Sequence, residues 1–448
     1  MQTSIPIGLA TPPAFTGPLP EAVDVAVIGG GIAGVMTAHF LTERGQRVLV
    51  CEKGRIAGEQ SGRNWGWIRQ QGRDPAELPI MVEALGHWKS FAQRLGAEAL
   101  GFRQTGVLYL ADGADDLEDY AAWLPHARAN GVDTRLLTRA EMRAMLPIEG
   151  GWPGALWTAS DARGEPFVAL PALAAMAAGA GVVLREGCAV RALDIAAGRV
   201  TGVVTEAGRV ACARVVLAGG AWSALFARAH GVALPQLSVR ASVAATVPLP
   251  EVFAGGAADG RFAFRRRADG GYTLAPGGAH DFWIGPDAVR GLRHYLPQLR
   301  RDLRSTRFRA AAPAGYPDAW TTPRRWDADR PGPFEACRIL DPAPNMAFLS
   351  RVQEDFARAF PALGRPQLAR AWAGMIDVMP DTVPVLDESP LPGLFLATGL
   401  SGHGFGIGPG VGRVMADLVM GNAPGHDLSR FRYGRFFDGT PMDLGPAL

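Results

Sequence analysis

The chain has 448 residues, which at roughly 150 residues per domain leaves room for two or three domains with cores of their own. Apolar residues make up 48% and charged residues 20%, which excludes disorder, collagen and coiled coil. The net charge is +2, too small to attract nucleic acid or an anionic lipid surface. Glycine is the outlier, with 57 residues, about 13% of the chain against a usual ~7%. The excess indicates many tight turns, or a backbone that approaches a ligand closely.

Nothing in the sequence predicts a metal site, secretion or a membrane span. The four cysteines lie far apart without a CxxC pair, so neither zinc nor a disulfide framework is expected. Residues 1–22 lack the basic and apolar regions of a secretory signal, and their prolines predict an extended arm. The longest apolar stretch, 168–184, is interrupted by Pro171, Gly179 and Gly181, and therefore indicates a helix followed by a strand. We expect a cytoplasmic protein.

The first structured segment predicts a βαβ unit. Residues 23–28 are apolar and rich in β-branched residues, as a buried parallel strand is. A glycine-rich turn follows, then a helix with apolar residues between Ala33 and Leu41, and then a second strand over 47–52. The turn and the second strand contain the residues that matter for function.

Gly29, Gly31 and Gly34 match the pattern G-x-G-x-x-G between that strand and that helix, and Glu52 follows 18 positions after Gly34. The first glycine permits a tight turn, the second lets the backbone approach a pyrophosphate, and the third lets helix and strand pack closely. The helix N-terminus offers free N–H groups to the phosphates. Glu52 can accept hydrogen bonds from both ribose hydroxyls, which makes NADP an unfavourable ligand. The pattern predicts a dinucleotide site.

The remaining elements follow in chain order. Helices are expected over 79–95, 115–130, 139–146 and 171–180, and strands over 106–110, 181–184 and 214–218, with a hairpin at 197–198 and 207–208. Alternating strands such as 261–267 and 272–274, with a helix near 286–304, predict an antiparallel region. After about 365 come a strand (394–397), a glycine loop (399–412) and a helix (411–420).

We therefore predict an α/β chain, α+β overall, in which a doubly wound Rossmann-type domain is interrupted by an inserted substrate domain with a mixed antiparallel sheet. The dinucleotide domain is expected to comprise 23–85, 150–235 and 365–448. The substrate domain is expected to comprise 86–149 and 236–364.

Two loops favour FAD over NAD. Ser61, Arg63 and Asn64 offer a hydroxyl, a cation and an amide to a ribityl-pyrophosphate, and the neighbouring Trp65 and Trp67 are unusual for a solvated loop. The loop that starts at 399 allows backbone amides to approach a flat ring, and the helix after it can stabilise negative charge on a reduced flavin.

These segments resemble the D-amino-acid oxidase superfamily of FAD enzymes, in the bacterial branch near the sarcosine oxidase β subunit and the opine oxidases. The matching pieces are VDVAVIGGGIAGVMTAHFL…VLVCEK, SGRNWGWIRQQ, ARVVLAGGAWS and WAGMIDVMPDTVPVL…GLFLATGLSGHGFGIGPGVGRVMADLV, spread over about 23–420. The resemblance implies a doubly wound FAD domain, a mixed sheet over the flavin, and oxidation of a C–N bond by hydride transfer to flavin N5.

The loops and the resemblance together define the expected FAD-binding residues. They are Gly29, Gly31, Ile32, Ala33, Gly34, Glu52, Lys53, Ser61, Arg63, Asn64, Trp65, Gly66, Val190, Gly219, Trp222, Gly374, Gly402, His403, Gly404, Phe405, Gly406 and Ile407. The FAD is expected to be non-covalent, because Gly374 stands where one group of relatives has cysteine and Trp65-Gly66 where another has histidine.

The sequence departs from the family at Ile376. Relatives that act on free amino acids often carry an arginine there, which pairs with the substrate carboxylate. With Ile376 followed by Asp377, a protonated amine would fit better, although Asp377 can also simply cap a turn. A different arginine could still bind a carboxylate, and the candidates are Arg69, Arg240 and Arg324.

His403, Asp377, Gln70 and Trp67 are the candidate catalytic residues. His403 lies in the glycine loop, where it can polarise the flavin, help deprotonate the substrate, or only bind backbone. Gln70, its neighbour Gln71 and the two tryptophans can wall the pocket, with core packing as the alternative. No nucleophile is needed, because a neutral amine can pass its α-hydride to the flavin directly.

Three functions follow. The first is an FAD-dependent oxidase or dehydrogenase of a small amine, which forms an imine that hydrolyses. The second is the same chemistry on D-, N-alkyl or opine-type amino acids. The third is a flavoprotein subunit of a hetero-oligomer that passes electrons to a partner. The electron acceptor is O2, a quinone or another carrier, nucleic acid is not expected as a partner, and a homo-oligomer is compatible with the sequence.

Overall fold

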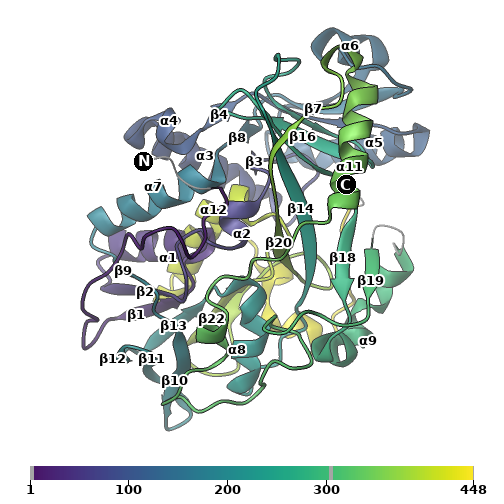
Figure 1. Ribbon diagram of the computed structural model, residues 1–448. Coiled ribbons are helices and arrows are strands. Elements are labelled where there is room, and N and C mark those ends of the chain that lie inside the picture. Colours follow the sequence, from purple (N-terminus) through teal and green to yellow (C-terminus); the bar gives the residue numbers. More distant parts are fainter. Residues whose placement is uncertain (1–4, 302–305, 447–448) are drawn as a thin grey trace.

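The computed structural model describes residues 5–301 and 306–446, so residues 1–4 of the predicted arm and the last residues of the predicted helix 286–304 lie outside the described part. The chain builds two large sheets and two small ones (Figure 1). The first large sheet has the order β21-β22-β13-β1-β2-β9, in which only β21 is antiparallel. Its strands are β21 (Val385–Glu388), β22 (Leu394–Thr398), β13 (Arg214–Leu217), β1 (Val25–Ile28), β2 (Val48–Glu52) and β9 (Val183–Glu186).

The strands of this sheet are buried on both faces, as their continuous apolar sequences predict. Val25 and Val27 of β1 face one core cluster, while Ala26 faces the other. Four helices cover the first face: α1 (Ile32–Glu43), α3 (Leu78–Leu95), α7 (Pro166–Gly179) and α12 (Gly404–Met420). The second face is covered by α8 (Ser223–Ala229) and by the small sheet of β10 (Val190–Ala196), β11 (Arg199–Thr205) and β12 (Gly208–Ala211).

The second large sheet has the order β19-β18-β14-β17-β16-β15-β5-β7-β6, with β20 paired to β14. Its strands are β5 (Val107–Leu110), β6 (Thr134–Thr138), β7 (Gly154–Thr158), β14 (Leu237–Thr246), β15 (Gly256–Ala258), β16 (Phe262–Arg266), β17 (Tyr272–Pro276), β18 (His280–Trp283), β19 (Thr306–Arg309) and β20 (Leu368–Val378). Its helices include α5 (Ala114–Ala129), α6 (Arg139–Met145), α9 (Pro286–Arg301) and α11 (Met346–Ala359). The α11 residue Phe356 packs on Phe262, Phe264 and Tyr272 of this sheet.

Three short helices and the second small sheet complete the described fold. The helices are α2 (Gln60–Arg63), α4 (Ala97–Leu100) and α10 (Pro333–Ala336), and the small sheet has the order β3-β8-β4, formed by β3 (Trp67–Ile68), β8 (Ala162–Arg163) and β4 (Arg103–Gln104). The pairing of β3 with β8 sets the direction in which the chain leaves Trp67 toward α3.

Two segments predicted as loops contain helix, and α7 begins earlier than predicted. The predicted loop 54–66 holds the single turn α2, and the predicted loop 399–412 turns into α12 already at Gly404. In α12 the glycines lie where the helix meets its neighbours: a Cβ on Gly408 would lie 2.4 Å from Ile32 Cγ1, and one on Gly412 would lie 2.5 Å from the Met36 carbonyl carbon. These glycines therefore permit close helix packing, which outweighs their low helix propensity.

The longest pairing joins segments far apart in the sequence. Strands β14 and β20 run antiparallel from Leu237↔Val378 to Thr246↔Leu368, and they lie side by side in Figure 1. Two strands from segments predicted for the dinucleotide domain, β7 and β20, thus hydrogen-bond within the second sheet. The helix α11 was not predicted from the sequence. The division into two domains stays a proposal.

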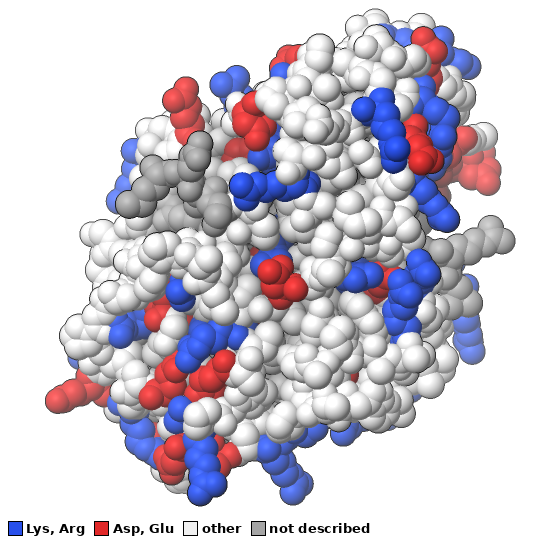
Figure 2. Space-filling view, viewed as in Figure 1, with Lys and Arg blue, Asp and Glu red and all other residues white. Residues whose placement is uncertain are grey.

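The surface carries both signs of charge. Figure 2 shows Lys and Arg interspersed with Asp and Glu over the visible face, without a field of one sign. Within residues 5–301 and 306–446, no helix is long and apolar enough to cross a bilayer. The same ranges contain no group of three or more His, Cys, Asp or Glu side chains arranged to hold a metal ion.

Candidate active site

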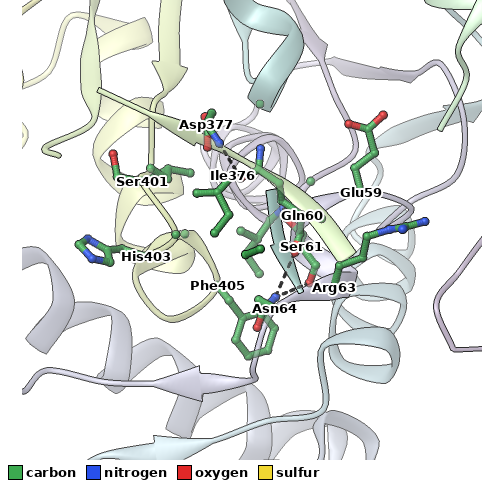
Figure 3. A pocket seen from close by; sticks show the side chains of 18 of the residues that line it. Glu59, Gln60, Ser61, Arg63, Asn64, Ile376, Asp377, Ser401, His403 and Phe405 are labelled. Carbon is green, nitrogen blue, oxygen red and sulfur yellow. Dashed lines mark hydrogen bonds between the residues drawn. The ribbon is translucent and has the colours of Figure 1, made fainter. Parts of the chain in front are cut away.

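A cavity of about 680 Å³ lies where the two large sheets meet. Its lining begins at the β1–α1 turn, passes Glu52 and the α2 segment, and ends at the β22–α12 connection around His403. The second sheet contributes Tyr109 of β5, Ala241 of β14 and Ile376 of β20. In Figure 3 the β20 residues lie between the connection with Ser401 and His403 on one side and Gln60, Ser61, Arg63 and Asn64, from α2 and its C-terminal end, on the other.

The β1–α1 turn has the geometry that the glycine pattern predicts. Gly29 has φ +112°, and a Cβ there would lie 2.4 Å from the Ala218 carbonyl oxygen. A Cβ on Gly34 would lie 2.0 Å from the Gly29 carbonyl oxygen, so α1 packs directly on the turn. Gly31 is the N-cap of α1 and offers no side chain to the first N–H groups of the helix. The N-terminus of α1 thus lies at the cavity, where it would stabilise an anion.

Glu52 and Ser61 support this turn. The Glu52 carboxylate accepts hydrogen bonds from the Gly30 N–H (2.8 Å) and the Gly54 N–H (2.7 Å). Burial raises the pKa of Glu52 to about 7, although Lys53 and these two bonds favour its charged form. The Ser61 hydroxyl accepts a hydrogen bond from the Ile32 N–H (3.0 Å), so α2 caps α1 across 29 residues of sequence.

The predicted contact loop is tied to distant segments. Arg63 donates to the carbonyl oxygens of Gly58 (2.8 Å) and Ala373 (2.9 Å), while its Nη2 has no hydrogen-bond partner among the described residues although it is buried. Lys53 does not point freely into the cavity, because its Nζ binds Glu59 (2.6 Å) and lies 4.4 Å from the Trp222 ring centroid. Glu59 also accepts a hydrogen bond from the Trp222 indole (3.1 Å), so Lys53 and Trp222 share one carboxylate.

Asp377 holds the connection between β22 and α12. Its carboxylate accepts hydrogen bonds from the Gly399 N–H (2.7 Å) and the Thr398 hydroxyl (3.3 Å), and the Ser401 N–H binds its carbonyl oxygen (2.9 Å). Burial raises the pKa of Asp377, and these hydrogen bonds counteract the rise. This is the turn-capping alternative that the sequence left open.

Most of the predicted site residues line this cavity. Those that do are Gly29, Gly31, Ile32, Ala33, Glu52, Lys53, Ser61, Arg63, Asn64, Trp65, Trp67, Val190, Gly219, Trp222, Gly374, Asp377, Gly402, His403, Gly404 and Phe405. Gly34, Gly66, Gln70, Gly406 and Ile407 are not part of its lining. Gln70 instead binds Ser160 (2.9 Å) and, through its backbone N–H, Asp161 (2.7 Å), which places it in the buried support of the β3–α3 segment.

The cavity fits FAD at both ends. Its dinucleotide end has the α1 N-terminus, where Ser61 binds the Ile32 N–H, the close backbone at Gly29 and the buried Arg63 Nη2, which suit phosphate oxygens. Its other end is lined by backbone around Gly402, where a Cβ would meet only the Ile376 side chain at 3.7 Å. One elongated ligand can therefore contact both ends, which lie about 370 residues apart in the sequence.

His403 adjoins a buried charged cluster that the sequence did not predict. Its Nδ1 lies 3.3 Å from Glu77 Oε2, and its carbonyl oxygen accepts a hydrogen bond from Arg73 Nη2 (3.1 Å). Burial lowers the pKa of His403, and the Arg73 charge lowers it further. In Figure 3 the imidazole points away from the α2 residues. Its neutral form can accept a proton.

Arg69, Arg73 and Tyr109 also line the cavity. The Arg69 guanidinium lies 5.2 Å from the Tyr109 ring centroid, and Trp67 packs between Trp65 (5.3 Å) and Tyr109 (6.2 Å). Sequence reasoning missed the cavity residues Arg73 and Tyr109, and it also missed Glu77, which contacts His403. The spacing of four residues between Arg69, Arg73 and Glu77 was visible in the sequence, but nothing in it indicated that they meet the distant His403 loop.

Fold and site together define an FAD-dependent oxidoreductase. Residues 24–418 match the family described as FAD dependent oxidoreductase, DAO, and the chain belongs to this family. The resemblance to D-amino-acid oxidases, the doubly wound fold and the FAD cofactor are thereby confirmed. Non-covalent attachment stays a prediction.

The relatives match most of the chain. The sarcosine oxidase subunit beta of Rhizobium meliloti is 27% identical over 440 residues, which span 96% of this chain and 92% of the relative. The glycine oxidase of Pseudomonas putida is 30% identical over 342 residues, 71% of this chain and 86% of the relative. Among solved structures, the L-amino acid deaminase from Proteus myxofaciens in complex with anthranilate superposes with a TM-score of 0.89 at 30% identity, covering 94% of this chain and 95% of that one.

Proposed function

We propose that this protein oxidises the CH–NH bond of an α-amino acid or an N-alkyl amino acid, and that Arg69 binds the substrate carboxylate. The observation that carries the proposal is the fate of the three candidate arginines. Arg69 lines the cavity. Arg240 is paired with the buried Asp281 (2.7 Å) and Arg324 with Asp318 (3.0 Å), and neither lines the cavity.

Arg69 is held so that part of its guanidinium remains available. Its Nη1 donates to the Gln71 carbonyl oxygen, and its plane lies over Tyr109. Within the described ranges no acceptor binds its Nε or Nη2. A planar guanidinium fixed in this way pairs well with a carboxylate, because two parallel N–H groups match two oxygens.

The argument for a plain amine loses part of its support. It rested on Ile376 in place of an arginine and on the acidic Asp377 beside it, but Asp377 is 2% exposed and its carboxylate is used by Gly399 and Thr398. The relatives point the same way, since one is named glycine oxidase and another, of Paramagnetospirillum magneticum, D-amino acid dehydrogenase.

In this proposal the residues of the chain bind, orient and deprotonate the substrate. FAD, when bound, supplies the two-electron acceptor for the hydride that leaves the α-carbon. Arg69 fixes the carboxylate and thus the position of the α-carbon. His403 takes a proton from the ammonium group, which frees the nitrogen lone pair for the C=N bond of the imine product. Trp65 and Trp67 exclude water from the reacting bond, and the imine hydrolyses after release.

An anaerobic titration tests the substrate class. Sarcosine, glycine, and the two enantiomers of alanine and proline are each compared with an amine that lacks the carboxylate, such as dimethylamine for sarcosine. We expect at least one carboxylate-bearing substrate to bleach the flavin absorption while its decarboxylated partner does not. Bleaching by the amines alone would overturn the proposal and support oxidation of a small amine instead. Peroxide formation in air then separates an oxidase from a dehydrogenase or a subunit that needs a partner.

The variant Arg69→Met tests whether Arg69 binds the substrate carboxylate. We expect it to raise KM for the carboxylate substrate about 100-fold or more, because a charge-assisted bidentate pair is lost. Arg69→Lys should recover part of this loss. Arg199→Met, at an exposed position of β11 outside the cavity lining, controls for the general loss of an arginine. An unchanged KM in Arg69→Met, with normal FAD content, would assign the carboxylate to another residue.

A further inference from the structure

Glu77 is a buried acidic residue whose side-chain contacts show no structural role. It is 0% exposed, and neither of its carboxylate oxygens has a hydrogen-bond partner among the described residues. Its nearest charged atoms are His403 Nδ1 at 3.3 Å and Arg73 Nη1 at 3.8 Å, both to Oε2. Those two nitrogens are also buried without a hydrogen-bond partner in the described part of the chain. Such a cluster is costly, because each group has lost its hydration.

Helix capping does not account for the carboxylate. Glu77 is the N-cap residue of α3, but its side chain makes no capping hydrogen bond. Glutamate is also a poor N-cap residue compared with serine, threonine, aspartate or asparagine. The carboxylate is directed instead to the β22–α12 connection, which carries His403.

The same cluster fixes the backbone of that connection. Arg73 Nη2 donates to the His403 carbonyl oxygen (3.1 Å), and the Arg73 carbonyl oxygen accepts a hydrogen bond from the Trp123 indole (2.8 Å). On α3 itself, the Trp88 indole donates to the Gly406 carbonyl oxygen (2.8 Å). Both ends of the His403 residue, ring and carbonyl, are thus oriented by the segment that leads into α3.

We propose that Glu77 is the positioning residue of the site: it holds His403 with the ring proton on Nδ1, which leaves Nε2 to receive the proton of the substrate ammonium group. This rests on the proposed function. In this structure His403 Nδ1 and Glu77 Oε2 lie 3.3 Å apart, and catalytic hydrogen bonds are often long or poorly aligned before the substrate binds.

The proton transfer is balanced within these groups. One N–H bond of the ammonium group breaks, and its electron pair stays on the substrate nitrogen. The proton forms a new N–H bond with the lone pair of His403 Nε2. Glu77 stays ionised and accepts a hydrogen bond from the Nδ1–H group of the resulting imidazolium. The buried carboxylate thus stabilises the added positive charge, which the neighbouring Arg73 alone would destabilise.

The charges around the pair set the direction of the pH effect. The charged groups that face Glu77 are His403, Arg73 and Arg69, and the Glu77 charge in turn raises the pKa of Asp74. Tyr109 and Asp161 also interact electrostatically with Arg73. Burial alone would raise the pKa of Glu77, but His403 and Arg73 hold it below its ordinary value, so Glu77 is ionised. Its charge raises the pKa of His403 against burial and Arg73. Removing the charge therefore lowers the pKa of His403.

Glu77→Gln in the FAD-loaded enzyme tests the proposal through the pH profile of kcat/KM. The reaction needs neutral His403, so activity falls at low pH as His403 becomes protonated. We expect the acid limb to move to lower pH by about one unit, with kcat reduced about 10- to 100-fold and KM little changed. Glu43→Gln is the matched control, because Glu43 lies 3.2 Å from the buried His39 on α1, outside the cavity lining. It should leave the profile unchanged.

The tautomer provides a readout that does not depend on turnover. Long-range ¹H–¹⁵N spectra of the imidazole groups, with His403→Gln to assign the signal, show which ring nitrogen carries the proton. We expect protonated Nδ1 and unprotonated Nε2 in the wild type, and a mixture of tautomers in Glu77→Gln. If Glu77→Gln fails to fold, Glu77→Asp keeps the charge and should retain the wild-type tautomer.

Two results would overturn the proposal. One is a wild-type His403 with its proton on Nε2. The other is a Glu77→Gln enzyme that loses thermal stability and FAD content while the acid limb stays in place, as a purely structural residue would. If no amino acid bleaches the flavin, the proposed function fails, but the tautomer of His403 still answers the question about Glu77.

Discussion

Gly34 leaves no space for a side chain, because its Cα faces the Gly29 carbonyl oxygen across the α1–β1 contact. The same closeness lets the first turn of α1 present its N–H groups to the cavity. At this scale the spacing of the glycines in the sequence was enough to predict the turn. It was not possible to predict the partners of the acidic and basic residues in the same way, because distant segments supply them.

Gly34→Ala should therefore destabilise the protein by about 1–3 kcal/mol and lower its FAD content, because the turn must move away from α1. Thermal unfolding and the flavin absorbance of the purified protein measure both effects. Gly86→Ala is the control: it lies on an exposed position of α3 where a Cβ would meet nothing within 4 Å. It should stabilise by roughly 0.5–1 kcal/mol. Equal behaviour of the two variants would contradict this account of Gly34.

At the scale of elements, α3 and α12 are joined by one carboxylate. Glu83 of α3 accepts hydrogen bonds from Arg413 of α12, from His426 beyond it, and from His87. Burial would raise the pKa of Glu83, but these three partners hold it well below its ordinary value. Because α12 begins next to His403, this network also holds the helix whose N-terminal end lines the cavity.

Glu83→Gln should lower the free energy of unfolding at neutral pH by about 1–3 kcal/mol, since a hydrogen-bonded charge is lost. The folded-state pKa lies below the ordinary value of 4.5, so this contribution is complete above that pH and is lost as the pH falls. Unfolding curves of variant and wild type should thus converge in acid. Glu118→Gln, on an exposed position of α5, makes the same change of charge without these partners. A difference that stayed constant with pH would rule out the ion-pair explanation.

At the scale of the whole molecule, the cavity brings together parts of the chain that are distant in the sequence. The cavity takes its lining from the first strand, from α2, from the second sheet and from the last helix. In Figure 1 the yellow α12 lies beside the purple α1, although they come from opposite ends of the sequence. A ligand that contacts all these parts stabilises the folded state as a whole.

Added FAD should accordingly raise the melting temperature of the apoprotein, with a stabilisation of about 2.7 kcal/mol at a free concentration 100 times Kd. Differential scanning fluorimetry over a series of FAD concentrations measures it. Riboflavin, which reaches only one end of the cavity, should stabilise less at equal concentration. A melting temperature independent of FAD would show that the cavity is not its site.

The sequence by itself determined the βαβ unit, its glycine turn, the acidic residue after β2 and the family, because these depend on local spacing and on the steric freedom of glycine. Only the tertiary structure decided which charged residues share the cavity. Arg240 and Arg324 are as charged as Arg69, but β14 and the segment after β19 direct them to other acids. Glu77 and His403 stand 326 residues apart, and their contact exists because α12 packs on α3 and α1 through glycines. Long-range packing, which no local pattern encodes, places these charges together.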